Sequence, residues 1–117
     1  MRYLFLFLIV MISCNSGNEG RISSVNELEK IDFTDGENVL LDVRSPEEFA
    51  EGHIPDAVNL DVNGENFEKE ISELDPSKTY YVYCHSGTRS TRACSELQEK
   101  GLKNLINLKD GYSAYKK

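Results

Sequence analysis

The stretch TYYVYCHSGTRSTRACSELQEK, residues 79–100, contains the pattern that decides the fold. Its aromatic and apolar start predicts a short strand over residues 80–83, and residues 88–100 predict a helix that Gly101 closes. Cys84 lies at the turn between them. At a strand-to-helix turn, backbone N–H groups converge at the positive end of the helix dipole, which lowers the pKa of a thiol and favours a bound anion.

The residues next to Cys84 favour a reactive cysteine over a buried structural one. A free cysteine is more often a small buried hydrophobic residue than a nucleophile. However, Gly87 permits a turn that exposes N–H groups, while His85 and Arg89 add positive charge near the sulfur. We therefore interpret Cys84 as a nucleophilic or sulfur-carrying cysteine, ahead of a metal ligand or a disulfide partner.

Strand and helix signals alternate along the rest of the chain. Strands are predicted over residues 39–43, 57–60, 80–83 and 104–108, and helices over residues 25–31, 45–51, 66–74, 88–100 and 111–117. This alternation predicts an α/β fold with a mostly parallel sheet. In such sheets ligands collect at the carboxyl ends of the strands, and Cys84 lies at one of these ends.

Two of the predicted helices have clear start signals. Ser24 and Glu27 have the spacing of a capping box. Ser45 is an N-cap residue, and Pro46 followed by acidic residues is typical of a first helical turn.

Length and charge limit the function classes. The chain has 117 residues, of which 39% are hydrophobic, and this is enough for one domain with its own core. Its formal net charge of -7 provides no basic surface for nucleic acid and no polybasic contact with a membrane.

The N-terminal segment has the pattern of an export signal. A short positive start, Met1-Arg2, precedes an apolar run of ten residues, 3–12. A membrane-spanning helix needs roughly 17–25 residues, so this run is too short to be one.

The end of that run, Met11-Ile12-Ser13-Cys14, resembles the lipobox of bacterial lipoproteins. The resemblance implies a signal peptide over residues 1–13, cleavage before Cys14, lipid attachment at Cys14, and an exported protein anchored to a membrane of the cell envelope by its lipid alone. Residues 14–20 would then be a polar tether and residues 21–117 the domain. A plain cleaved signal with an incidental cysteine is the alternative.

The remaining cysteine, Cys94, is predicted to pack in the core. It shares one helix face with Ser90, Ala93 and Leu97. The sequence contains no C-x-x-C pair and no cysteine and histidine cluster at zinc spacing, so we predict no metal site.

Three stretches together resemble a single rhodanese domain: residues 41–49, 52–60 and 82–93, with a weaker fourth match over residues 104–115. They span essentially the whole of residues 21–117. The resemblance implies a rhodanese-like α/β fold, with a small, mainly parallel, five-stranded sheet flanked by helices.

The resemblance also implies sulfurtransferase activity without a metal or an organic cofactor. A small anionic donor such as thiosulfate would give sulfur to Cys84, and the persulfide would pass it to a thiophilic acceptor such as a thiol or cyanide, or to an acceptor protein. The loop after Cys84 would form the substrate cradle, with Arg89 pairing with the oxygens of the donor. That cradle comprises His85, Ser86, Gly87, Thr88 and Arg89.

Four positions depart from the family pattern. His85 stands where arginine is frequent, Asp56 replaces a frequent glycine, Asp110 replaces the first glycine of a pair, and Tyr115 replaces a common tryptophan. The exchange at position 85 bears on donor preference, because a titrating imidazole replaces a permanent guanidinium charge.

Other residues of the matched stretches are interpreted as structural. Asp42 and Arg44 are expected to form an ion pair near the end of the sheet, and this pair could also order the active loop. His53 is expected to be a loop residue, and the tyrosines of residues 80–83 to pack on the sheet.

Two other functions compete with a sulfurtransferase. Cysteine phosphatases also use a Cys-headed anion loop, but their arginine follows after five residues, which is Ser90 here, and Arg89 comes one residue early. By comparison with that family, the shorter loop suits sulfur better than a phosphoryl group. The other alternative is a non-turnover persulfide carrier, or a binding or sensing module for a partner protein.

Overall fold

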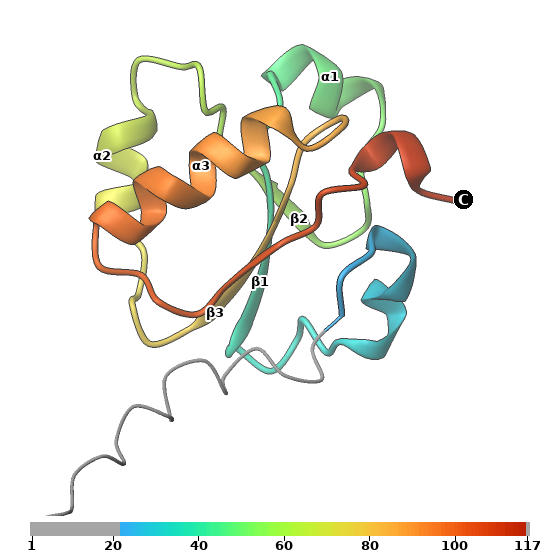
Figure 1. Ribbon diagram of the computed structural model, residues 1–117, viewed down its shortest axis with the longest axis horizontal. Helices are drawn as coiled ribbons and strands as arrows, with labels where there is room; N and C mark the ends of the chain where they lie inside the picture. The colour runs from blue at the N-terminus through green and yellow to red at the C-terminus, as the bar shows by residue number, and fades with distance from the viewer. Residues whose placement is uncertain (1–21, 117) are drawn as a thin grey trace, which may run out of the picture.

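The computed structural model describes residues 22–116, which form an α/β fold around one parallel sheet (Figure 1). The strands are β1 (Asn38–Asp42), β2 (Ala57–Asn59), β3 (Thr79–Tyr83) and β4 (Leu105–Asn107), and their order in the sheet is β2-β1-β3-β4. The three strand pairs are parallel, and Asp42 lies beside Tyr83 at the carboxyl ends of β1 and β3. The predicted fold class is thus confirmed.

Helices connect the strands and cover both faces of the sheet. The α-helices are α1 (Pro46–Glu51), α2 (Phe67–Ser72) and α3 (Thr88–Glu99), and two 3₁₀ helices are η2 (Val25–Lys30) and η3 (Tyr112–Ala114). In Figure 1, α2 and α3 lie over one face of the sheet, while η2 and η3 lie at the other side.

The two inner strands, β1 and β3, are buried on both faces because they are apolar at successive positions. Leu41 and Val82 face α2 and α3, whereas Leu40 and Tyr81 face η2. Burial of both faces is the normal condition of a parallel sheet, and it explains why these strands show no alternation of polar and apolar residues. Cys84 belongs to the cluster beneath α2 and α3, directly after β3.

The predicted count of five strands is wrong for the described residues, which contain four. Before η2, the backbone N–H groups of Ser23 and Ser24 donate to the side chain of Glu27, at 3.0 and 3.2 Å. The Ser24 N–H belongs to the capping box of η2 and the Ser23 N–H bonds to the same carboxylate oxygen, so both groups are directed to the helix start and not to a strand.

The last predicted helix is also shorter than expected. Residues 111–117 were expected to be helical, but of these the structure describes residues 111–116, where the single turn of η3 forms and no longer helix. The backbone beyond it is extended at Tyr115, and Asn26 of η2 bonds to the carbonyl of Ala114 at 2.8 Å and to the N–H of Lys116 at 2.9 Å. These bonds hold the C-terminal segment against η2 in place of helix formation.

The predicted signal peptide, lipid attachment at Cys14 and tether lie outside the described residues. Within residues 22–116, no helix has both the length and the apolar character that a membrane span requires.

Candidate active site

Cys84 is placed by the central strand of the sheet. It follows β3, which lies between β1 and β4, and only 1% of its surface is exposed. The N–H of Gly87 donates to its Sγ at 3.0 Å. The strand therefore delivers the sulfur to the head of α3, where donors of the loop point at it, as the sequence predicts.

The pKa of the Cys84 thiol is lowered from its ordinary value. Burial raises this pKa, but hydrogen bonds from the backbone and hydroxyl of Ser90, followed by those from the backbone of Gly87 and Ser86, more than offset it. Hydrogen bonds to the anionic form favour the thiolate, which is the nucleophilic form of cysteine.

Gly87 is required by the shape of the loop. It precedes α3 with a φ of 104°, in the left-handed region that favours glycine. A Cβ at this position would lie 2.6 Å from the carbonyl oxygen of Lys109. The Gly87 carbonyl also accepts a hydrogen bond from the Thr91 hydroxyl, so the same residue begins the helix and directs an N–H at the sulfur.

Residues 110–113, which we call the C-terminal strap, support the loop through hydrogen bonds to its backbone. The N–H of Tyr112 donates to the Cys84 carbonyl at 2.8 Å, and the N–H of Ser113 donates to the His85 carbonyl at 3.0 Å. A Cβ on Gly111 would collide with the His85 carbonyl. Asp110 binds the Ser24 hydroxyl at 2.6 Å and so fastens the strap to the start of η2.

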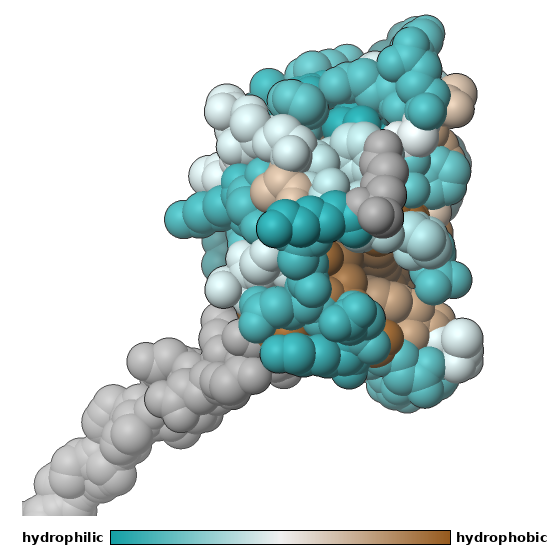
Figure 2. Space-filling model, turned by 90° about the vertical axis from the view of Figure 1, so that its right-hand side faces the viewer, coloured by the Kyte–Doolittle hydropathy of each residue, from teal (hydrophilic) through white to brown (hydrophobic). Residues whose placement is uncertain are grey.

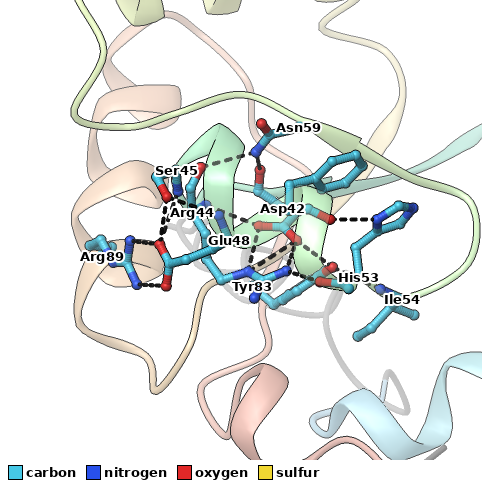
Figure 3. Close-up of polar contacts among 11 residues, drawn as sticks. Asp42, Arg44, Ser45, Glu48, His53, Ile54, Asn59, Tyr83 and Arg89 are labelled. Carbon is cyan, nitrogen blue, oxygen red and sulfur yellow. Dashed lines mark hydrogen bonds and ion pairs between the residues drawn. The ribbon is translucent and has the colours of Figure 1, made fainter.

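The predicted substrate cradle separates into two parts. The side chains of His85, Ser86 and Thr88 are exposed on the loop, whereas Gly87 is buried beside the sulfur. Arg89 turns toward α1, where Nη1 and Nη2 donate to the two carboxylate oxygens of Glu48 at 2.8 and 3.1 Å (Figure 3). The loop cation is therefore paired with a carboxylate of the protein.

Glu48 is a site residue that sequence reasoning missed. Its hydrogen bond with Arg89 lowers its pKa to about 2; burial acts in the opposite direction, and bonds from the backbone and hydroxyl of Ser45 lower the pKa further. The spacing of Ser45 and Glu48 is the signal available in the sequence, because it matches a capping box. That signal predicts the start of α1, but it does not predict that Glu48 pairs with Arg89 on α3.

The predicted ion pair of Asp42 and Arg44 is present at the carboxyl end of β1. Arg44 Nη2 lies 2.7 Å from Asp42 Oδ2, and the side chains are 4% and 0% exposed. The Tyr83 hydroxyl donates to the same Oδ2 at 2.6 Å. Burial first, and then this bond to Asp42, raise the pKa of Tyr83, which therefore remains a neutral donor.

Arg44 also connects the pair to α1 and to the strap. Its Nη2 donates to the carbonyl of Gly52 at 2.7 Å, just after α1, and its guanidinium carbon lies 4.4 Å from the centre of the Tyr112 ring. Because Tyr112 in turn bonds to the Cys84 carbonyl, the ion pair supports the active loop through the strap. Sequence reasoning missed the hydroxyl of Tyr83 and the ring of Tyr112.

An open cleft of about 310 Å³ lies beside the loop. Its lining includes one member of each ion pair and one residue of the loop: the lining residues are Arg44, Glu48, Glu51, Gly52, His85 and Tyr112. A second groove, of about 360 Å³, is lined by η2 and by residues near Phe33, Ile54 and Tyr115, away from Cys84. Figure 2 shows hydrophobic residues on the floor of a hollow on that side of the molecule.

The remaining candidates have structural environments. His53 is exposed, stacks on Phe49 with ring centres 3.7 Å apart, and its Nδ1 lies 2.9 Å from the Phe49 carbonyl oxygen. Cys94 packs against the core, and burial raises its pKa to about 11. Within residues 22–116, no three His, Cys, Asp or Glu side chains gather in a way that could hold a metal ion.

Comparison with known proteins connects this site to one family. The model of the rhodanese-like domain matches residues 24–117. A sulfurtransferase of Allochromatium vinosum is 36% identical over 96 residues, which cover 78% of this chain and 88% of that protein. The thiosulfate sulfurtransferase GlpE of Shewanella oneidensis is 34% identical over 93 residues, which cover 79% of this chain and 88% of that protein.

Solved structures give the same result. A rhodanese-like domain protein from Staphylococcus aureus is similar with a TM-score of 0.66 and 26% identity, over 77% of this chain and 85% of that one. A human single-domain sulfurtransferase is similar with a TM-score of 0.62 and 25% identity, over 77% of this chain and 89% of that one.

Proposed function

The chain belongs to the rhodanese-like domain family, and from this membership we propose that it is a sulfurtransferase that carries sulfane sulfur as a persulfide on Cys84. One observation carries the proposal. The sulfur of Cys84 is buried at the head of α3 and accepts the N–H of Gly87, in an environment that lowers its pKa. Such an environment suits a thiolate and the anionic persulfide that follows it.

The first half-reaction loads the sulfur. With thiosulfate as the donor, the Cys84 thiolate attacks the outer sulfur, the sulfur–sulfur bond of thiosulfate breaks, and sulfite leaves with the electron pair. The products are a deprotonated persulfide and sulfite, so no proton needs to move. Because the thiol pKa is already lowered by the loop, the step needs no general base.

The second half-reaction returns the enzyme to its thiolate. A nucleophile such as cyanide or a thiolate attacks the outer sulfur of the persulfide, and Cys84 leaves as the thiolate. We expect the N–H donors of the loop, such as that of Gly87, to stabilise both the thiolate and the persulfide anion. Donor and acceptor reach the sulfur from the exposed side of the loop, where His85, Ser86 and Thr88 lie.

The loading step is tested by intact mass. Incubation with thiosulfate is expected to add one sulfur atom to the protein, and cyanide is expected to remove it. Cys84→Ser should neither load nor unload, since its hydroxyl is close in size to the thiol but far less nucleophilic. The control is Cys94→Ser, which removes the other described cysteine and should load normally. Loading of Cys84→Ser together with none in Cys94→Ser would place the sulfur on Cys94 and end the proposal.

A second candidate is a persulfide carrier that delivers sulfur to a partner protein without turnover on small acceptors. The observation that favours it is the near-complete burial of Cys84, because a buried persulfide is protected from solvent thiols. Repeated turnover with thiosulfate and cyanide supports the enzyme. Loading of a single sulfur that cyanide does not remove supports the carrier.

We also propose that the protein is an exported lipoprotein with Cys14 as its lipidated first residue. The support is the basic start, the apolar run of residues 3–12 and the Ser13-Cys14 junction. Replacement of Cys14 by Ser is expected to release the protein from membranes or to block its processing. Unchanged fractionation and processing of that variant would contradict the proposal.

A further inference from the structure

The guanidinium of Arg89 is occupied by a carboxylate of the same chain. Its two bonds to Glu48, of 2.8 and 3.1 Å, use both terminal nitrogens and both carboxylate oxygens. This two-point contact is also how a guanidinium would bind the oxygens of a sulfonate-like donor. Glu48 and an anionic donor therefore compete for the same face of Arg89.

Glu48 is fixed in this position by its own helix. The N–H and the hydroxyl of Ser45 both bond to Glu48 Oε1, at 3.1 and 3.0 Å, as part of the cap of α1. Its carboxyl group has a pKa of about 2 and stays ionised at neutral pH. The charge that balances Arg89 is thus permanent and held in place by the backbone.

Among the described residues, the other charged side chains beside the loop do not offer an unpaired guanidinium. The other guanidinium next to the loop, that of Arg44, is paired with the buried carboxylate of Asp42. Glu51 lines the cleft together with Glu48 and contributes a further negative charge. A dianion that approaches Cys84 therefore meets two balanced pairs and an additional carboxylate.

From this arrangement we propose that Glu48 determines donor preference: it holds Arg89, disfavours dianionic donors, and leaves donors with one negative charge or none, such as hydropersulfides, as the physiological class. This inference rests on the sulfur-transfer function proposed above. It identifies Glu48 as a specificity residue that acts through Arg89.

A hydropersulfide donor needs no free guanidinium. The Cys84 thiolate attacks the outer sulfur of R–S–SH, the S–S bond breaks, and the thiolate RS⁻ leaves with the electron pair while the proton stays on the transferred sulfur. The reaction has no sulfite-like leaving group that requires a cation. The N–H donors around Cys84 suffice to hold the sulfur that is transferred.

The test compares two donors that differ by one charge. Thiosulfate is a dianion whose leaving group is sulfite, whereas methanethiosulfonate is a monoanion whose leaving group is methanesulfinate. Both deliver the same outer sulfur to Cys84. The rate of loading is followed by intact mass over a range of donor concentrations, which gives kcat/KM for each donor.

The variant is Glu48→Gln, with Glu47→Gln as its matched control. Glutamine keeps an oxygen that can accept the Ser45 bonds, because a capping box tolerates Gln at this position, and it removes the charge that holds Arg89. Glu47 is an exposed residue of the same helix, so its substitution changes the net charge by the same amount.

The Coulomb energy between Glu48 and a donor scales with the charge of the donor. The logarithm of the change in kcat/KM caused by Glu48→Gln should therefore be half as large for the monoanion as for the dianion. Glu48→Gln should raise kcat/KM on the order of tenfold for thiosulfate and about threefold for methanethiosulfonate. Glu47→Gln should change either value by less than about twofold, because an exposed charge is screened by solvent.

If thiosulfate loads Cys84 in the parent protein, an unchanged or lower kcat/KM for thiosulfate in Glu48→Gln would overturn the inference. Equal gains for the two donors would overturn it as well, since the effect would not follow donor charge. If neither donor loads Cys84 in the parent protein, the proposed function itself fails, and this inference fails with it.

Discussion

Two arginine–carboxylate pairs lie close to the start of α1, one just before it in the chain and one formed by a residue of the helix, and they differ in burial. Asp42 and Arg44 are 0% and 4% exposed and share hydrogen bonds with Tyr83 and Gly52. Glu48 and Arg89 are 35% and 27% exposed, and Glu48 lines the cleft beside the loop. Because solvent screens the second pair but not the first, the two pairs should respond differently to mutation.

The buried pair is part of the scaffold. Removing one partner would leave the other charge in a dry environment, which is the costly case for buried ions. The exposed pair contributes little to stability, because water can replace either partner. Its position at the mouth of the site gives it a role in the charge that a donor meets. Burial therefore separates a structural pair from a pair that adjusts binding.

The largest expected effect is loss of stability on breaking the buried pair. Arg44→Met should lower the free energy of unfolding by about 3–5 kcal/mol, because Asp42 keeps its charge without its partner. The matched change in the other pair, Arg89→Met, should cost about 0–1 kcal/mol. Urea unfolding followed by circular dichroism measures both. Equal losses in the two variants would show that burial does not distinguish the pairs.

The next effect is on sulfur loading from thiosulfate. Arg89→Ala should lower kcat/KM for loading by roughly tenfold to a hundredfold, because it removes the cation that balances Glu48 and leaves that carboxylate to repel the dianion. Arg89→Lys should lose less, since it keeps the charge but not the two-point geometry. Stopped-time intact mass measures the rates. Parent-like loading by Arg89→Ala would remove Arg89 from the substrate site.

The local signals of the sequence were sufficient for most of the fold. The capping box of Ser24 and Glu27 is observed, and so is the Ser45 cap of α1, because caps depend on residues that are close in sequence. The turn at Cys84 was also predictable, since strand, glycine and helix follow one another directly. The fifth strand came from the family resemblance alone, and the sheet of the described residues has four strands.

The contacts of the site were less predictable because they join distant parts of the chain. Glu48 and Arg89 are separated by 41 residues, and their meeting depends on how α1 and α3 pack around the sheet. In the sequence, Glu48 is a helix-start acid and Arg89 a free cation. The strap contacts of Tyr112 with Cys84 likewise appear only when the chain returns to the loop through β4.

The smallest expected effect is the loss of the stabilisation that Glu48 provides as the pH is lowered. The pKa of Glu48 is lowered in the folded protein, to about 2 from an ordinary value of 4.5, chiefly by Arg89. A group whose pKa is lower in the folded state stabilises the fold above its unfolded pKa. That stabilisation is lost as the pH falls from about 4.5 toward 2, because the unfolded chain binds the proton first.

Since the pair is partly exposed, the amount lost should be at most about 1 kcal/mol. It is measured as the difference between the parent protein and Glu48→Gln in free energy of unfolding, at pH 7 and again at pH 3. Other carboxylates, such as those of Asp32 and Asp75, whose pKa values are also lowered, are common to both proteins and cancel in that difference. The parent should be more stable than the variant at pH 7, and the gap should narrow at pH 3. A gap that is the same at both values would mean that the Glu48 charge does not contribute to folding, and that its pairing with Arg89 serves the site alone.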